Sequence, residues 1–331
     1  MEQPQSIKPE SYDNLIEKFN ERPVLFLPEK SVISYEEVEK VRQESGANTL
    51  YACDFNIEGI EEFEEGGYFQ REHIINIDHH SESPNYRKQI SSTNLAIEFI
   101  RNNPGFLTNT KTITHHTDCD SVLSTLLMSS ILPPEERFGV AAIAADHTGE
   151  PNEIADLLQG LKDGPEGEMG EKNTPERNHD KYLFCLEQLQ NLLAGKDLDV
   201  RAQKLYQKRL QERQLLQGII TEGKVKYAGS NGEVAYMETG EEKFDATLLT
   251  GLLPNAKIIF TARQGENGKT IINVRLGLAM KESVDLRDIM NGVQEPFGGR
   301  WNAGANKRKG GSDSSPQKIA EKIANYLNRK N

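Results

Sequence analysis

The segment HIINIDHH, residues 73–80, decides how this chain is expected to fold. Its apolar part, His73 to Ile77, has the composition of a short buried strand, and an Asp-His-His triplet follows directly. In open α/β sheets, ligands bind beyond the carboxyl ends of the strands. We therefore expect residues 78–80 to lie in a functional site.

Strands and helices alternate on both sides of this segment. This alternation predicts an α/β fold, with a mostly parallel sheet and flanking helices in the N-terminal domain. Val140 to Ala145 is read as either a buried strand or a helix, ending at Asp146. Further strands are predicted at Pro23–Pro28, Asn48–Asp54 and Lys111–His115, and helices at Ser34–Glu44, Ser91–Arg101 and Ser121–Ile131.

The pattern changes towards the C-terminus. Lys162 to Asn178 has the Gly, Pro and charge content of an exposed loop, and Asp180 to Thr221 has helical spacing. Strands return from about Lys224, including a hairpin, and predict a smaller α/β domain. A chain of 331 residues exceeds the usual size of one core. We predict a catalytic domain over residues 1–190, a helical linker over 191–222 and a substrate-binding domain over 223–331.

Composition limits the class of protein. Three scattered cysteines predict neither a disulfide framework nor a CxxC zinc site. The first residues lack a basic segment followed by an apolar one, and no apolar run approaches the ~18 residues of a membrane span. A cytoplasmic protein without a membrane partner is expected.

The net charge of −12 is unevenly distributed. Residues 223–331 contain 17 Lys and Arg against 12 Asp and Glu, a net charge of +5, whereas residues 1–222 contain 22 against 39, a net charge of −17. An acidic part that binds metal and a basic part that binds phosphate would give this division. Ordinary solvated surfaces would give it as well.

Acid and imidazole groups gather where the predicted strands end. Carboxylates and neutral imidazoles bind Mn²⁺ well, and two such ions about 3.5–4 Å apart activate water and neutralise a phosphate. Ligands from separate strands would meet at one edge of the sheet. The candidates are Asp54, Asp78, His79, His80, His116, Asp118, Asp120 and Asp146.

These residues resemble the DHH phosphoesterase superfamily, which includes family II inorganic pyrophosphatases, exopolyphosphatases and nucleases that degrade oligonucleotides. The triplet Asp78-His79-His80 matches the motif that names the family, and Asp54 precedes it at the end of another predicted strand. AADHTG at 144–149 resembles a later family motif, and FGGRWNAG at 297–304 resembles the family's GGGHxxAAG signature. The resemblance covers most of the chain. It implies two Mn²⁺ or Mg²⁺ ions and a DHH-associated substrate-binding domain.

The chain departs from the family pattern in two places. Residues 23–45 lack the usual first-strand motif, HxxPDxD or DxDxDG, and HHTDCDS at 115–121 resembles that motif instead. A circular permutation of the metal-binding order would explain this, if the later strand still occupies its usual place in the sheet. The second departure is Arg300, where the signature usually has His. Arginine still holds phosphate through its planar fork.

The resemblance also implies a role for each residue of the centre. Asp54 would bridge both ions, His80 would contact the phosphate or protonate the leaving oxygen, and Asp78 would orient a neighbouring histidine. A water activated between the ions would attack phosphorus. The remaining metal ligands would be His116 (or His115) with Asp118 on one ion, and His79, Asp120 and Asp146 on the other.

Substrate contacts are expected from the C-terminal part. Gly298 and Gly299 would let backbone N–H groups approach phosphate, with Arg275 and Arg300 as further donors. His147 is either a substrate contact or part of a turn without function. Trp301 is either a base-stacking surface or a packed core residue.

The pattern predicts a hydrolase of short single-stranded oligonucleotides or phosphate-containing small molecules such as nucleotide phosphates. Two alternatives remain open. DxDS at 118–121 also resembles exopolyphosphatases, which favours a polyphosphatase or pyrophosphatase activity. The missing first-strand motif would also suit a sensor that binds nucleotide or RNA without hydrolysing it. The oligomeric state is not predicted.

Overall fold

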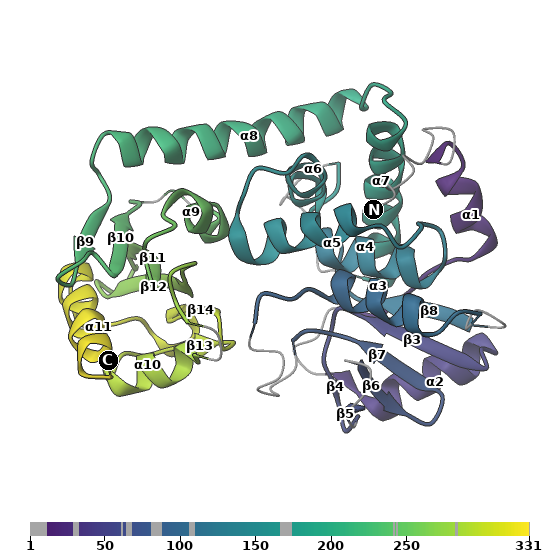
Figure 1. The fold of residues 1–331 in the computed structure, drawn as a ribbon, viewed down its shortest axis with the longest axis horizontal. Coiled ribbons are helices and arrows are strands. Elements are labelled where there is room, and N and C mark those ends of the chain that lie inside the picture. The colour runs from purple at the N-terminus through teal and green to yellow at the C-terminus, as the bar shows by residue number, and fades with distance from the viewer. Residues whose placement is uncertain are drawn as a thin grey trace, which may run out of the picture. The chain divides into compact units, whose positions relative to one another are not determined.

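The computed structural model describes residues 12–28, 33–60, 62–63, 68–80, 88–105, 110–165, 174–240, 242, 244–281 and 284–330. The chain divides into two compact units (Figure 1). The first contains Met1–Ser81, Ile90–Ala145 and Pro151–Leu210, and the second contains Glu82–Gln89, Asp146–Glu150 and Gln211–Asn331. Across the described ranges, no helix combines the length and hydropathy needed to span a membrane.

The first unit is built on a six-stranded sheet, beside which β2 (Ile33–Ser34) pairs separately with β4 (Ile57–Glu58). The strands of the larger sheet are β1 (Leu25–Phe26), β3 (Thr49–Cys53), β5 (Glu62–Phe63), β6 (Tyr68–Arg71), β7 (Ile74–Ile77) and β8 (Thr110–Thr114). Their order is β1-β8-β3-β7-β6-β5. The pairs β1/β8, β8/β3 and β3/β7 are parallel, whereas β7/β6 and β6/β5 are antiparallel. The predicted α/β fold with a mostly parallel sheet is therefore confirmed.

Strand β3 shows how the sheet is buried on both faces. Alternate side chains of a strand point to opposite faces. Leu50 and Ala52 pack with Val38 of α2 (Tyr35–Ser45) in one apolar cluster, whereas the Tyr51 ring lies 5.7 Å from the Phe99 ring of α3 (Ser92–Asn102). Helices therefore cover both faces (Figure 1), which is why the parallel strands read as continuous apolar runs.

Beyond α2 and α3, the sequence predicts helices at 121–131 and 180–221 in this unit, but none at 15–21 or 153–161. The remaining helices are α1 (Leu15–Glu21), α4 (Cys119–Met128), α5 (Glu136–Ile143), η3 (Ala144–Thr148), α6 (Glu153–Leu161), α7 (Pro175–Leu193) and α8 (Val200–Thr221). Both η3 and α8 begin in the first unit and end in the second. Val140 to Ala145 is helical, so the expectation that Asp146 follows a strand is wrong; Asp146 lies in the π-helical turn η3 instead. Helix α7 begins inside the predicted loop, because Thr174 caps it. Residues 166–173 of that loop lie outside the described residues.

The second unit is a six-stranded sheet covered by helices. Its elements are β9 (Lys226–Ala228), β10 (Val234–Glu238), α9 (Ala246–Leu252), β11 (Ile258–Gln264), β12 (Thr270–Leu276), α10 (Leu286–Gly292), β13 (Gly298–Gly299), β14 (Ala303–Ala305), η4 (Lys307–Lys309) and α11 (Pro316–Lys330). The strand order is β13-β14-β12-β11-β10-β9, with a single parallel pair, β10/β11, among its described strands. Ile258 and Phe260 pack with α10 and α11, and Ile259 between them packs with α8 and α9. The predicted hairpin is the antiparallel pair β11/β12.

The cysteines give a test of this packing. Cys53, Cys119 and Cys185 are buried, and none of the three forms a disulfide. Burial raises the pKa of the Cys53 thiol above its usual range and that of the Cys185 thiol to about 12. Because thiolates are the reactive form, we expect no reaction with Ellman's reagent at neutral pH in the folded protein, and reaction of all three thiols in guanidinium. Rapid reaction of one thiol in the folded protein would contradict this packing.

Candidate metal centre

Asp54 occupies the middle of the site because β3 lies between β8 and β7. The residue follows β3 directly, and its backbone N–H donates to the Ile77 carbonyl at 2.9 Å. Its φ of 64° lies in the left-handed region, which is uncommon for a residue other than Gly, although Asp and Asn adopt it most readily. The carboxylate is 1% exposed and accepts hydrogen bonds from Ser92 Oγ at 3.0 Å and Ser121 Oγ at 2.5 Å.

His79 is oriented as a metal ligand would be. Its Nδ1 donates to the Ile90 carbonyl at 2.7 Å. This bond places the proton of the neutral ring on Nδ1 and a lone pair on Nε2. That Nε2 atom lies 3.7 Å from Asp54 Oδ1 and 3.6 Å from Asp120 Oδ2. A backbone carbonyl on the far nitrogen of a histidine is the usual support of a ligating imidazole.

His80 and Asp78 form a second pair at the end of β7. Asp78 is fully buried, and its Oδ1 accepts from His80 Nδ1 at 2.7 Å. The same Nδ1 lies 3.5 Å from Asp54 Oδ1. The His80 side chain is 18% exposed, against 5% for His79. His80 is therefore the more accessible histidine.

Asp120 has a structural contact that the sequence did not suggest. Its carboxylate accepts the backbone N–H groups of Ser92 and Thr93, both at 2.7 Å, and the Thr93 hydroxyl at 2.6 Å. It thus caps the first turn of α3. Burial raises the pKa of Asp120 to about 6, against the opposing effect of these hydrogen bonds. A carboxylate offers about four lone-pair sites, so one is left for an ion.

Taken together, these groups fit a divalent cation. One ligand atom each from Asp54, His79 and His80 lies within 4.8 Å of the others. Carboxylate oxygens and imidazole nitrogens are the ligands that Mn²⁺ and Mg²⁺ sites use, with imidazole favouring Mn²⁺ over Mg²⁺. Buried carboxylates also need positive charge nearby.

The HHTDCDS segment lies beside Asp54, but its first half faces a different pocket. Ser121 links the two places, because its backbone N–H donates to Asp118 Oδ1 at 3.1 Å and its hydroxyl donates to Asp54. Asp118 also caps α4. His115, His116 and Asp118 line a pocket with residues of α7 and of the turn after α6, and the ligand group around Asp54 in the described part of the chain contains none of the three. Asp118 is connected to Asp54 through Ser121, and the permuted order of the motifs stays a prediction.

Asp146 and the substrate candidates Arg275 and His147 lie in the second unit. Arg275 donates to the Asp146 carbonyl at 2.6 Å and to the Thr247 hydroxyl, and burial lowers its pKa. It thus anchors the turn that carries Asp146. Arg275 and His147 line one pocket with Trp301, whose ring is 6.4 Å from that of His147.

Gly298 and Gly299 form β13, which pairs with β14. A Cβ on Gly299 would lie 2.4 Å from Gly304 Cα, so packing requires glycine there, whereas the nearest atom to a Cβ on Gly298 would be 3.7 Å away. The backbone N–H of Arg300 donates to the Ala303 carbonyl at 2.8 Å. Packing therefore explains glycine at position 299 but not at position 298.

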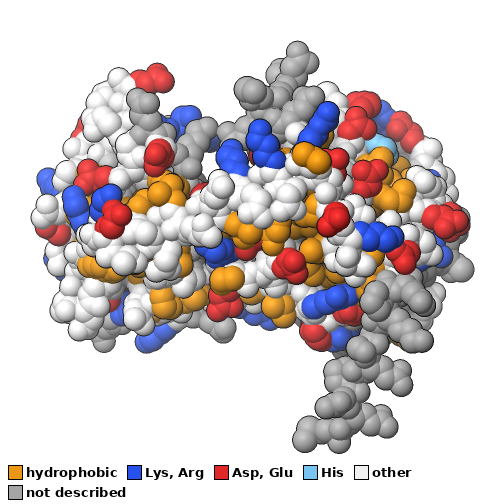
Figure 2. Space-filling view, turned by 90° about the horizontal axis from the view of Figure 1, so that it is seen from above, with side chains coloured by type: hydrophobic (Ala, Val, Ile, Leu, Met, Phe, Trp, Pro, Cys, Tyr) orange, Lys and Arg blue, Asp and Glu red, His pale blue; other side chains and the backbone are white. Residues whose placement is uncertain are grey.

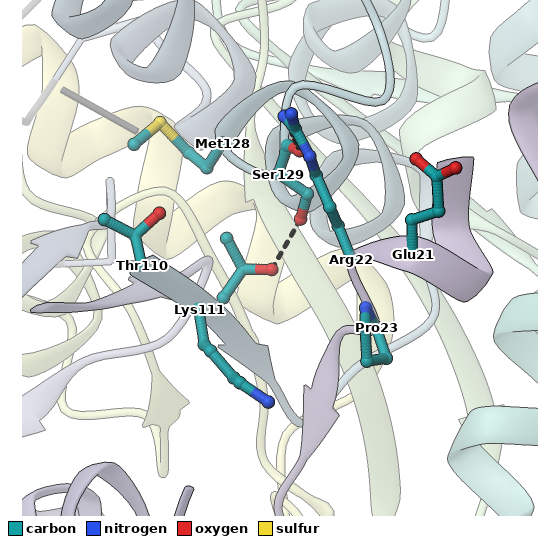
Figure 3. Close-up of a pocket in the computed structure, with 8 residues that line it drawn as sticks. Glu21, Arg22, Pro23, Thr110, Lys111, Met128 and Ser129 are labelled. Carbon is teal, nitrogen blue, oxygen red and sulfur yellow. Dashed lines mark hydrogen bonds between the residues drawn. The ribbon is translucent and has the colours of Figure 1, made fainter. Parts of the chain in front are cut away.

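A further pocket lies at the amino end of β8, away from the residues that follow this strand. Lys111, Arg22 and Ser129 line it (Figure 3). Arg22 extends towards Ser129, whose carbonyl it approaches at 3.5 Å, while Lys111 points away (Figure 3). Since these two cations do not converge, we do not assign a phosphate site to this pocket.

Sequence reasoning missed Ile90, Ser92 and Thr93. They hold His79, Asp54 and Asp120 through a carbonyl, a hydroxyl and two backbone N–H groups. Their only signal was the SST run at 91–93, a helix start of the kind that offers donors to an anion.

No protein-family model and no curated protein matches the chain. Among solved structures, it resembles a pGpG-specific phosphodiesterase, PggH, from Vibrio cholerae, at 11% identity over 68% of this chain and 82% of that chain, with a TM-score of 0.43. It also resembles an uncharacterized protein from Helicobacter pylori G27, at 15% identity over 89% of this chain and 87% of that chain, with a TM-score of 0.24. Because both TM-scores are below 0.5, neither likeness assigns a function to this chain.

Asp54→Asn tests the centre. Asn tolerates the left-handed backbone about as well as Asp, so the fold should persist while Mn²⁺ affinity, measured by calorimetry, falls at least about 10-fold through loss of a charged ligand. Asp180→Asn, at a side chain 82% exposed, is the matched control. Asp54→Ala is less informative, because Ala at this φ is strained. Unchanged Mn²⁺ binding by Asp54→Asn would remove Asp54 from the ligand set.

Proposed function

We propose that this protein is a metal-dependent phosphoesterase that hydrolyses short oligonucleotides or nucleotide phosphates. The observation that carries the proposal is the orientation of His79, whose Nδ1 is held by the Ile90 carbonyl while Nε2 lies near the carboxylates of Asp54 and Asp120. A histidine fixed in this tautomer next to buried carboxylates is suited to holding a cation.

Two Mn²⁺ or Mg²⁺ ions are proposed, with Asp54 between them. Bound ions would neutralise the phosphate and activate the attacking water. The ligands proposed for one ion are His116, or His115 in its place, with Asp118; those for the other are His79, Asp120 and Asp146.

The protein's own proton chemistry is assigned to His80. Asp78 accepts from His80 Nδ1, which holds the ring in place, and a protonated ring carries a second proton on Nε2. The opposite nitrogen can then donate to a phosphate oxygen or to the leaving oxygen. The greater exposure of His80 relative to His79 supports access to substrate.

The second unit is proposed to bind the rest of the substrate. Arg275, His147 and the half-buried Trp301 line one pocket, together with Lys88 and Lys281. Cations and an aromatic ring suit a nucleotide, which offers both phosphate and a base to stack. On the face shown in Figure 2, basic and acidic side chains are interspersed, so the proposal rests on this pocket rather than on surface charge. Gly298, Gly299 and Arg300 are proposed as additional phosphate contacts.

The decisive assay compares dinucleotides, 3′-phosphoadenosine 5′-phosphate and polyphosphate as substrates, with Mn²⁺ and after chelation. We expect Mn²⁺-dependent hydrolysis of one of the first two and no hydrolysis after chelation. Release of phosphate from polyphosphate alone would support the exopolyphosphatase alternative. Nucleotide binding without hydrolysis of any substrate would support a sensor and overturn the enzyme assignment.

Substitutions of His79 and His80 are expected to change different kinetic quantities. His80→Asn should lower kcat about 10²-fold or more, as loss of a general acid does. His79→Asn should instead raise the Mn²⁺ concentration needed for half-maximal rate. Steady-state kinetics over a range of Mn²⁺ concentrations measures both. Identical profiles for the two variants would contradict the division of roles.

Arg275→Lys separates an anchor from a substrate contact. Lys cannot replace the two-pronged contact with Asp146 and Thr247. We expect the half-saturating Mn²⁺ concentration to rise about 10-fold, as for loss of an outer-shell partner, with kcat restored at high Mn²⁺. Arg263→Lys, on the neighbouring strand β11, is the control. A raised KM for substrate at saturating Mn²⁺ would assign Arg275 to substrate binding instead.

A further inference from the structure

A second pocket of the first unit has no role in the proposed substrate contacts. It lies where β8 ends and is bordered by the turn after α6 and by the first half of α7. Its titratable side chains carry both signs. They are His115, His116, Asp118, Lys162, Asp163 and Lys181, with Thr117 and Asn178 completing the lining.

Hydrogen bonds tie the walls of this pocket to one another. The Thr117 hydroxyl donates to the Lys162 carbonyl at 2.7 Å, which joins the end of β8 to the end of α6. The buried Asn178 donates to the His115 carbonyl at 3.3 Å, which joins β8 to α7. A pocket held from three elements keeps its shape before a ligand arrives.

Lys181 is a buried cation in this pocket. The residue is 8% exposed. A buried ammonium group raises the benefit of negative charge nearby, because it has lost part of its water. Gly164, at a φ of 80°, makes room for the side chain, since a Cβ there would lie 2.9 Å from Lys181 Cγ. Lys162, an exposed residue, also lines the pocket.

His115 supplies a second, independent sign of a ligand. The residue is 5% exposed, and its Nδ1 has no hydrogen-bond partner among the described residues. Its ring packs against those of Phe55, at 5.0 Å, and His116, at 3.7 Å, which fixes it in place. A buried polar atom without a partner costs free energy, and an oxygen-rich ligand in the pocket would recover it.

The two carboxylates that line the pocket, Asp118 and Asp163, do not offset the positive charge of its lysines equally. Asp118 Oδ1 already accepts the Ser121 N–H at the start of α4, and in the proposed function Asp118 binds a metal ion. With the metal ion bound, Lys162 and Lys181 remain in the lining beside one further carboxylate, Asp163. An anion is therefore the ligand that the loaded pocket favours.

We propose that this pocket, through Lys181, Lys162 and His115, binds a terminal phosphate of the substrate that is not the one hydrolysed. The inference rests on the proposed function, with His116 rather than His115 on the metal, and narrows its substrate class to nucleotides that carry a phosphomonoester beside the scissile phosphate. The pocket is suitably placed, because Phe55 follows Asp54 directly and Asp118 connects to Asp54 through Ser121.

The test compares a dinucleotide with and without a 5′-phosphate, both with Mn²⁺. We expect wild-type kcat/KM to be at least about 10-fold higher for the phosphorylated form, because one hydrogen bond to a charged group contributes at least that much. Lys181→Met, which keeps the side-chain length, should bring this ratio towards one. Lys162→Gln, at an exposed side chain, should lower the ratio without endangering the fold. Lys204→Met on α8, also exposed, should leave it unchanged.

Titration with inorganic phosphate, followed by the imidazole ¹⁵N signals of the Mg²⁺-loaded protein, tests the pocket without turnover. The His115 signals of the wild-type protein should shift. His115→Asn, with a donor near the position of Nδ1, should bind phosphate better than His115→Leu.

Two outcomes separate this inference from the function on which it rests. Equal kcat/KM for both dinucleotides, together with no phosphate-dependent shift, would overturn the pocket assignment while leaving the phosphoesterase proposal intact. No hydrolysis of either dinucleotide, with the phosphate shift present, would overturn the phosphoesterase proposal and leave an anion site.

Discussion

Three carboxylates buried at one edge of a sheet impose the main electrostatic constraint on the first unit. Asp54, Asp78 and Asp120 are each at most 1% exposed. Removing an ionised carboxylate from water is expensive unless charge and hydrogen bonds replace the lost solvent. The surrounding structure is arranged to supply them. Serine hydroxyls donate to Asp54, the first turn of α3 donates to Asp120, and His80 donates to Asp78.

These partners also prepare the site for an ion. The left-handed backbone at Asp54 turns the chain at the point where β3 leaves the sheet. Local strain of this kind persists only where its surroundings determine it, and here β7 and β8 flank the strand. The Ile90 carbonyl then fixes the tautomer of His79. A cation would enter a set of ligands that is already oriented, which reduces the entropy lost on binding.

In the second unit, two residues singled out in the sequence as phosphate contacts have structural roles. Gly299 is required by the close approach of β14, and Arg275 by the turn at Asp146. Both residues resembled phosphate-binding groups in sequence, and their observed contacts are structural. Arg275 has a second environment as well, because it lines a pocket with His147 and Trp301.

Much of the fold could be predicted from local pattern. The apolar strands before Asp54 and Asp78 and the hairpin β11/β12 were recognisable from periodicity and turn residues. The placement of Asp146 after a strand was wrong because a short apolar run suits either a buried strand or a helix, and packing decided for the helix. The division at residues 191–222 stays a prediction.

The order of residues along the chain is enough to show which chemistry is available, since aspartates and histidines follow the predicted strands in numbers that suit metal ions. Only the tertiary structure decided which of them meet. Strand order brought β8 beside β3, although four other strands and a helix separate them along the chain and nothing local encodes their pairing. The tertiary fold also places Asp120 at the start of helix α3, gives His79 a carbonyl partner, and brings His115 into one pocket with Lys181. Such contacts join residues that are far apart along the chain, and burial selects them only once the whole sheet has formed.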